Sequence, residues 1–398
     1  MTTDHRDPEA SGLRVAMIGH GFMGAAHSQG WRVAPRFFDV PAQPHMAVVV
    51  GRNVEATAAA AEKWGWDEAA NDWREVVARD DIDIVDIVTP GDSHAEIAIA
   101  ALEAGKHVLC EKPLANTVAE AQAMTDAATA AAARGVRAMV GFTYRRVPAV
   151  TLMRDLIAAG KVGMVQQVRA AYRQDWLVDP QMPLAWRLQK EHAGSGALGD
   201  IGAHIIDMTQ FVTGLSVDSV SGVLDTIVKE RPLLGSGSGL SGTAAEGYGE
   251  VTVDDVAIFA GRLSNGALAS FEATRFATGR KNGLTIEISG DEGALAFDLE
   301  DLNTLRFYDR TVPDEVQGFT RILVTEPQHP YISAWWPAGH MLGYEHGFSH
   351  QVKDLVEAIA AGEDPHPTFA EGLAVQRVLA AVEESSQNGS AWVGTGPA

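Results

Sequence analysis

The residues best suited to chemistry in this chain are one lysine, one aspartate and one histidine. Lys112 lies between Glu111 and Pro113, and much later a glycine-rich run leads into Asp200 and His204. An ammonium group can polarise a substrate oxygen, and an imidazole with a pKa near neutrality can remove a hydroxyl proton. We therefore predict that Lys112, Asp200 and His204 form the catalytic group of an enzyme that acts on an alcohol carbon.

The spacing of the acidic residues around His204 predicts how that group is held. Asp200, His204 and Asp207 occupy positions i, i+4 and i+7, which share one face of an α-helix. We expect Asp200 to orient the imidazole and Asp207 to make a structural hydrogen bond. A zinc site is the alternative, because His and Asp also bind metals. We expect no metal, since the sequence offers no evident third ligand and Lys112 would take over its electrostatic role.

A second motif, near the N-terminus, is typical of a phosphate-binding turn. Gly19, Gly21 and Gly24 fit the pattern G-x-G-x-x-G directly after the apolar run 13–18. In such turns the first glycine permits the bend, the second lets a pyrophosphate approach the backbone, and the third lets helix and strand pack closely. The pattern predicts a bound dinucleotide, with contacts from the glycines and from the residues between them, Phe22 and Met23. A purely structural turn is the alternative.

The end of the second predicted strand should distinguish NAD from NADP. An acidic residue there would bind the ribose 2′-hydroxyl, but this chain has Arg52 and Asn53. Arg52 could pair with a 2′-phosphate, stack on adenine or be an ordinary surface arginine. We expect both residues to contact the cofactor, with a slight preference for NADP, and the choice between NAD and NADP stays open.

Two later strand ends supply further candidate cofactor contacts. Ligands of open α/β sheets bind outside the carboxyl ends of the strands, and the runs 82–88 and 107–110 both end in such residues. Pro90 would form a rigid wall beside a nicotinamide ring, whereas His94 either contacts a ligand or bonds the backbone. The predicted contacts at these two ends are Thr89, Pro90, His94, Glu111 and Lys112.

Aromatic and cationic residues around the histidine motif are suited to a sugar. Aromatic faces pack on C–H surfaces, and a guanidinium can bond several hydroxyl groups. For either tryptophan taken singly, a place in the core is the commoner explanation. The predicted substrate contacts are Lys112, Tyr144, Arg145, Trp176, Arg187, Asp200 and His204.

The alternation of predicted elements gives an α/β protein with two domains. Apolar strands alternate with Ala-rich helices over residues 13–143, which predicts a doubly wound parallel sheet of the Rossmann type. Residues 144–398 alternate with short turns and predict an α+β domain with a large, mostly antiparallel open sheet. We expect a disordered tail over residues 1–12 and a mobile loop over the Gly- and Ser-rich stretch 234–249.

Composition excludes several classes of partner. The 398 residues include 31 basic and 52 acidic side chains, a net charge of −21, which disfavours nucleic acid and anionic membrane surfaces. No apolar run is long enough to cross a bilayer, and the polar N-terminus does not resemble a secretion signal. The single cysteine, Cys110, fits a reducing compartment, so we expect a cytoplasmic protein.

Taken together, these motifs resemble the Gfo/Idh/MocA family of oxidoreductases, and the resemblance extends from Val15 to about Val393. It is carried by the Gly19–Gly24 turn, by Glu111-Lys112-Pro113 and by the run that ends at His204. The runs around Tyr144, Trp176 and Arg187 resemble members that oxidise sugars and anhydrosugars. Thr143 departs from the pattern, since many members have Asn there.

The resemblance implies a fold, an activity and an assembly. It implies that Lys112, Asp200 and His204 are catalytic, with His204 as the acid/base, and that a ring hydroxyl is oxidised, commonly at C3. It also implies a homodimer or homotetramer formed through the C-terminal sheet.

The leading hypothesis is an NAD(P)-dependent dehydrogenase that moves a hydride between nicotinamide and a ring carbon of a sugar, anhydrosugar, glycoside or cyclitol. One alternative is a non-catalytic dinucleotide sensor, which would have no need of both Lys112 and His204. The other is an enzyme that uses a bound cofactor transiently, for hydrolysis or epimerisation through a keto intermediate.

Overall fold

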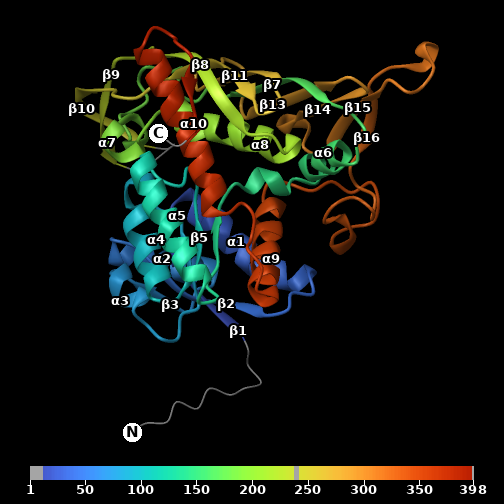
Figure 1. Cartoon of the computed structure of the whole chain (residues 1–398). Helices are drawn as coiled ribbons and strands as arrows, with labels where there is room; N and C mark the ends of the chain where they lie inside the picture. Colours follow the sequence, from blue (N-terminus) through green and yellow to red (C-terminus); the bar gives the residue numbers. More distant parts are fainter. Residues whose placement is uncertain (1–11, 237–241, 397–398) are drawn as a thin grey trace.

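A computed structural model describes residues 12–236 and 242–396. The tail expected over residues 1–12 lies outside this part of the chain except for Gly12, which begins the first strand. Figure 1 shows two sheets, one in each half of the molecule, with helices packed on them.

The N-terminal sheet is parallel and has the strand order β3-β2-β1-β4-β5-β6. The expected doubly wound sheet is therefore confirmed, with the short strand β3 as an addition to the expected elements. Its strands are β1 (Gly12–Ile18), β2 (Gln43–Val50), β3 (Glu68–Ala70), β4 (Ile84–Ile87), β5 (His107–Cys110) and β6 (Ala138–Val140). The helices between them are α1 (Phe22–Phe37), α2 (Val54–Trp64), α3 (Trp73–Val77), α4 (His94–Glu103) and α5 (Val118–Ala132).

The C-terminal sheet has nine strands in the order β16-β15-β14-β13-β7-β12-β11-β8-β17. Every neighbouring pair is antiparallel except β12 and β7, so the expected mostly antiparallel sheet is confirmed. Its strands are β7 (Val165–Arg173), β8 (Val217–Asp225), β11 (Val256–Leu263), β12 (Leu268–Thr274), β13 (Gly283–Gly290), β14 (Gly293–Asp298), β15 (Thr304–Asp309), β16 (Thr320–Leu323) and β17 (Val393–Gly394).

The described parts of the stretch 234–249 are not the loop that its composition predicts. They belong to two paired antiparallel strands, β9 (Glu230–Ser236) and β10 (Thr243–Glu250), and residues 237–241 lie outside the described part of the chain. The backbone of Leu184 donates to Pro232 O at 2.7 Å and so ties this strand pair to the loop before α7 (Lys190–Ala193). Strand pairing and this contact outweigh the weak propensity of Gly and Ser for strands.

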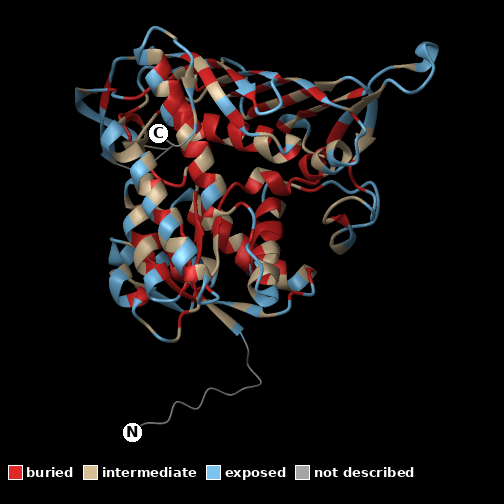
Figure 2. Cartoon of the chain, in the orientation of Figure 1, coloured by how far each residue is buried: buried red, intermediate tan, exposed pale blue. Residues whose placement is uncertain are grey.

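Helices from the second half cover one face of the large sheet and also reach the first half. The helices α6 (Pro148–Ala158), α8 (Ala203–Thr213) and α10 (Phe369–Gln387) pack on the sheet, and α10 also contacts α5. Helix α9 (His346–Ala361) instead packs against α1, as Figure 1 shows. Figure 2 shows buried residues concentrated in both sheets and along the inner faces of these helices.

The contact between α1 and α9 depends on a glycine. A Cβ built on Gly30 would lie 2.8 Å from Phe348 O and 2.9 Å from the carbonyl carbon of Phe348. The helices can therefore approach this closely only because position 30 has no side chain.

We predict that Gly30→Ala lowers the free energy of unfolding by about 1–3 kcal/mol, because the methyl group pushes α1 from α9. Alanine alone would favour the helix by about 1 kcal/mol, so a net loss reports the clash. Urea unfolding measures the change. The control is Gly318→Ala, which has no described atom within 4 Å of its Cβ and should change stability by less than about 0.5 kcal/mol. Equal effects from both variants would contradict the packing argument.

Candidate active site

The structure brings Lys112 and Asp200 together between the two sheets. Lys112 follows β5, and its ammonium donates to the main-chain carbonyl of Asp200 at 2.8 Å and lies 3.5 Å from Asp200 Oδ1. The Lys112 side chain is only 14% exposed. Two of the three predicted catalytic residues are thus in direct contact.

The backbone around Asp200 is a π-helical turn, Leu198–Gly202, that leads into α8. Asp200 therefore lies in a π-helical turn and not in the α-helix expected for it, while its charge still acts on His204. The Asp200 carboxylate faces Lys112 and Arg275, with Arg275 Nη1 at 3.8 Å from Asp200 Oδ2. Asp207 does make the structural bond expected of it, to Arg145.

The buried carboxylate of Asp254 binds the backbone at the start of this turn. Asp254 Oδ1 accepts from Gly196 N at 2.7 Å, and Oδ2 accepts from Leu198 N at 2.8 Å. A Cβ on Gly196 would lie 1.7 Å from Asp254 O, so no side chain fits at that position. The glycine-rich run therefore serves a close backbone approach that sets the position of Asp200.

Positive charges control the ionisation of Asp200. Burial alone would raise its pKa, but the charges of Lys112, Arg187 and Arg275 lower the pKa of the carboxyl to about 2. Asp200 is therefore an anion at neutral pH. Three cations thus lie near one carboxylate at this site, which favours additional negative charge on a bound substrate.

His204 lies in an aromatic environment at the start of α8. Its ring centroid is 4.7 Å from that of Tyr144, 5.9 Å from Tyr172 and 6.0 Å from Phe142. Burial and the nearby Lys112 charge hold its pKa well below the ordinary 6.5. Within the described residues, His204 Nδ1 is a buried atom with no hydrogen-bond partner. A neutral imidazole is the form that can accept a proton.

A chain of hydrogen bonds runs from Tyr144, beside His204, to Trp176. Tyr172 donates to Asn282 Oδ1 at 2.7 Å, so its oxygen accepts from Tyr144 at 2.9 Å. Gln174 also donates to Asn282 Oδ1, and Gln174 Oε1 accepts from Trp176 Nε1 at 3.0 Å. These bonds fix the rings of Tyr144 and Trp176, two of the predicted substrate contacts.

The two predicted arginines have different surroundings. The Arg187 guanidinium carbon lies 4.3 Å from the centroid of the Trp186 ring, and its charge acts on Asp200. Arg145 is buried, and its guanidinium bonds Asp207 and Glu371. These bonds use the donors of Arg145 for structure and do not support its predicted role in substrate binding.

The Gly-rich turn fits a pyrophosphate. Gly19 has φ +106°, and its built Cβ would be 3.0 Å from Val88 O, whereas no described atom lies within 4 Å of a Cβ on Gly21. Gly21 caps α1, and within the described residues its first turn contains no acidic side chain. Free amides at a helix N-terminus bind phosphate. Phe22 at this turn is 62% exposed and stacks on Tyr344.

The other predicted cofactor contacts lie around this turn. Arg52 and Asn53 are exposed, and Asn53 caps α2 by accepting from Ala56 N at 2.9 Å. His94 is buried, with ring nitrogens 2.9 Å from Thr89 O and 3.1 Å from Pro113 O. His94 thus joins the loops at the ends of β4 and β5, which matches its structural alternative.

The remaining predicted cofactor contacts lie close by in the same loops. Pro90 precedes α4 and accepts from Ser93, and Met23 lies in the first turn of α1. Both Glu111 carboxylate oxygens are engaged inside the protein, by His27 and by the amide of Lys112.

Across residues 12–236 and 242–396, no group of three His, Cys, Asp or Glu side chains is placed to hold a metal ion. No helix within the same described ranges is both long and apolar enough to span a membrane.

The fold and this site define a nicotinamide-dependent oxidoreductase, and the comparisons with known proteins agree. The description "Oxidoreductase family, NAD-binding Rossmann fold" matches residues 13–142, and "GFO/IDH/MocA C-terminal domain" matches residues 150–296. The chain belongs to the Gfo/Idh/MocA family. The family, fold class and oxidoreductase activity predicted from the sequence are confirmed.

The chain is similar to several characterised or solved members. It is 43% identical over 386 residues to levoglucosan dehydrogenase of Pseudarthrobacter phenanthrenivorans. The aligned region covers 96% of this chain and 97% of the relative. An oxidoreductase domain protein from Kribbella flavida superposes with a TM-score of 0.93 and 61% identity, covering 97% of this chain and 100% of that chain. Levoglucosan dehydrogenase in complex with NADH and levoglucosan superposes with a TM-score of 0.91 and 41% identity over the same shares.

Several residues of the site were missed by sequence reasoning. Arg275, Asn282 and Tyr172 come from three different strands or strand ends, and no local motif marks them. The usable signal in the sequence was indirect. The alternation of apolar and polar residues along the strands indicates which side chains face the helices.

We predict that burial of neutral His204 makes stability depend on pH. Its folded pKa lies below its unfolded value, so below about pH 6.5 the unfolded chain takes up a proton that the folded chain does not, and stability falls. Relative to His204→Gln, the wild type should lose at most about 1.4 kcal/mol per pH unit from about pH 6.5 downward. Urea unfolding of both proteins at about pH 7.5 and about pH 5 checks this. A difference that does not change with pH would contradict it.

Proposed function

We propose that this protein is an NAD-dependent dehydrogenase that oxidises a ring hydroxyl of a sugar, anhydrosugar, glycoside or cyclitol. The observation that carries the proposal is the joint placement of the Lys112 ammonium, the Asp200 carboxylate and the neutral His204 ring beside a phosphate-binding turn. The similarity to levoglucosan dehydrogenase supports an anhydrosugar or a related pyranose.

Each side chain has a distinct role in the reaction. His204 accepts the hydroxyl proton, since its buried ring is neutral in the free protein. Lys112 donates a hydrogen bond to the same oxygen and stabilises the negative charge that develops on it. Asp200 holds the Lys112 ammonium in place and bonds a neighbouring hydroxyl. A nicotinamide bound at the glycine-rich turn would supply the hydride acceptor for the oxidation and the hydride donor for the reverse reaction.

The aromatic residues select the substrate. Trp176 is fixed by Gln174, and Tyr144 is fixed by Tyr172, so two rigid ring faces line the pocket. Sugars present C–H faces to such rings, whereas Arg187 supplies donors to hydroxyl oxygens. This arrangement favours a compact polyol ring over a long chain.

We propose NAD as the cofactor. Arg52 alone indicates a slight preference for NADP, but Asn53 is used as a helix cap, and the solved levoglucosan dehydrogenase complexes contain NADH. The residues suited to holding it are Gly19, Gly21, Phe22, Met23, Gly24, Arg52, Asn53, Thr89 and Pro90, whereas the polar groups of His94 and Glu111 are used inside the protein.

Absorbance of reduced nicotinamide tests the proposal directly. Purified protein is mixed with NAD or NADP and with a panel of anhydrosugars, hexoses, glycosides and inositols. We expect a rise with NAD and at least one pyranose or anhydrosugar. Cofactor binding without a rise for any sugar would contradict a dehydrogenase and would fit a sensor or an enzyme with transient redox chemistry.

We predict that Lys112→Ala and His204→Ala each lower kcat by roughly a hundredfold or more. Cofactor binding, measured by fluorescence titration of NADH, should change little, because neither side chain belongs to the phosphate-binding turn. Lys229→Ala and His340→Ala remove an exposed lysine and an exposed histidine and serve as controls. Wild-type turnover in either pocket variant would sink the catalytic assignment.

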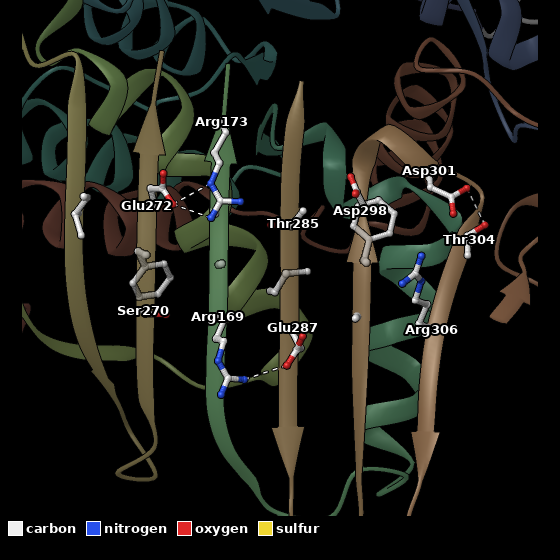
Figure 3. Close-up of a pocket in the computed structure, with 17 residues that line it drawn as sticks. Arg169, Arg173, Ser270, Glu272, Thr285, Glu287, Asp298, Asp301, Thr304 and Arg306 are labelled. Carbon is white, nitrogen blue, oxygen red and sulfur yellow. Dashed lines mark hydrogen bonds and ion pairs between the residues drawn. The ribbon is translucent and has the colours of Figure 1, made fainter. Parts of the chain in front are cut away.

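We propose that a second copy of this chain binds the open face of the large sheet. Figure 3 shows this face, with Arg169 paired to Glu287 and Arg173 paired to Glu272 above the strands. Ile258 on the same face is 52% exposed. A mixed row of charges with exposed apolar side chains suits a self-complementary contact in a homodimer or homotetramer.

We predict that Ile258→Glu converts the oligomer to smaller species, because it places an extra carboxylate in the apolar part of the contact. Light scattering coupled to size exclusion measures the mass. Val316→Glu, a comparable change of an exposed residue outside this face, is the control. A wild-type protein that is monomeric at micromolar concentration would contradict the assembly.

We place the protein in the cytoplasm, because its one cysteine, Cys110, is buried and free, which fits a reducing compartment.

A further inference from the structure

A chain of buried polar groups lies behind Lys112, on the side away from Asp200. Trp31 Nε1 donates to Asp86 Oδ2 at 2.7 Å, and His27 Nδ1 lies 3.0 Å from both oxygens of Asp86. The other ring nitrogen, His27 Nε2, lies 3.0 Å from Glu111 Oε1. Glu111 Oε2 then accepts the main-chain N–H of Lys112 at 3.1 Å. The chain thus ends on the backbone of the catalytic lysine.

The geometry favours a positive charge on His27. Both ring nitrogens face carboxylate oxygens, and a neutral imidazole has only one N–H to donate. The His27 side chain is 1% exposed, and those of Asp86 and Glu111 are 0% and 5% exposed. Burial opposes the charge, but Asp86 and Glu111 together raise the pKa of His27 to about 10.

The three charged groups come from elements that meet at the catalytic loop. His27 and Trp31 are one turn apart on α1, Asp86 is on β4, and Glu111 follows β5. A Cβ on Gly141 would lie 2.7 Å from Glu111 Oε1, so the carboxylate is packed against the backbone after β6. Glu111 therefore has little freedom once His27 has bonded it.

We propose that His27 is a positioning residue, which holds Glu111 so that Glu111 fixes the backbone of Lys112 and thereby its ammonium. The proposal rests on the catalytic role of Lys112 given above. A purely structural triad is the competing explanation. Buried ionic groups add little net stability compared with apolar side chains of the same volume. A purely structural triad also gives no reason why the last hydrogen bond is made to the amide of Lys112.

Two isosteric substitutions separate the links of the chain. In His27→Gln the amide nitrogen stands near the place of Nε2 and can still donate to Glu111. In His27→Asn it stands near the place of Nδ1, so the bond to Asp86 survives and the bond to Glu111 is lost. We expect kcat to fall roughly tenfold to a hundredfold in His27→Asn and clearly less in His27→Gln, with little change in the KM for NAD.

Hydrogen exchange at the Lys112 amide supplies a readout that needs no substrate. We expect this amide to exchange at least about tenfold faster in His27→Asn than in the wild type, and closer to wild type in His27→Gln. The matched control is His350→Gln, which removes another buried histidine, bonded to Arg146 O and Trp335 Nε1. It should lose stability and leave kcat and the Lys112 amide unchanged.

The outcomes separate this proposal from the proposed function. A wild-type Lys112 amide rate in His27→Asn, or equal effects of the Asn and Gln variants on kcat, would overturn the positioning role. Faster exchange in His350→Gln as well would overturn it too, since the effect would then be global. If no sugar is oxidised but the exchange pattern is as expected, the positioning role stands and the dehydrogenase assignment fails.

A measurement on the wild type keeps the proposal testable if the variants do not fold. In ¹⁵N-labelled protein at about pH 8, both ring nitrogens of His27 should show the chemical shifts of a protonated imidazolium. A neutral ring would overturn the proposal.

Discussion

The contact between Lys112 and Asp200 is the interaction on which the site depends. An ammonium removed from water needs a charged or polar partner, and Lys112 finds one in the carbonyl and the carboxylate of a single residue. The same contact joins the loop after β5 to the turn before α8, and so joins the two sheets at the point of chemistry. Because Arg275 and Arg187 add their charges to that of Lys112, positive charge exceeds negative charge around Asp200. Negative charge that develops on a substrate oxygen during oxidation is therefore stabilised.

The position of Asp200 depends on the backbone conformation around it as well as on the ion pair with Lys112. A π-helical turn, which is wider than an α-helical one, carries Asp200 just before α8. Asp254 bonds two amides of this segment, and Gly196 packs on the Asp254 carbonyl. The glycines thus let a buried carboxylate approach the chain. Asp200 thus bonds Lys112, while burial and the Lys112 charge together keep the His204 ring neutral.

The sequence predicted the parts that depend on local patterns. Strand ends followed by Gly21 or Lys112 are recognisable because parallel sheets place such ends at one edge, and Asp200 is recognisable by the glycine-rich run that precedes its helix. The sequence could not predict the π-turn, which has no compositional signature, or the pairing of β9 with β10, which forms against their own Gly-rich composition. Arg145 looked available for substrate, but its partners Asp207 and Glu371 are distant in sequence and become neighbours only in the fold. His27 was overlooked for the same reason, since its meaning comes from Asp86 and Glu111.

Helix α1 connects these separate requirements. Its N-terminus presents amides at the phosphate-binding turn, His27 in its second turn reaches Glu111, and Gly30 one turn later lies against α9. The rigid helix therefore ties the cofactor turn, the catalytic loop and the C-terminal segment to one another. The parallel sheet alone places the phosphate-binding turn and Lys112 at the same edge. Without a further contact, the distance between them would depend on two loops that could move independently. A buried cation between Asp86 and Glu111 removes that freedom, and it does so from behind the pocket, where it leaves the cleft open to cofactor and sugar.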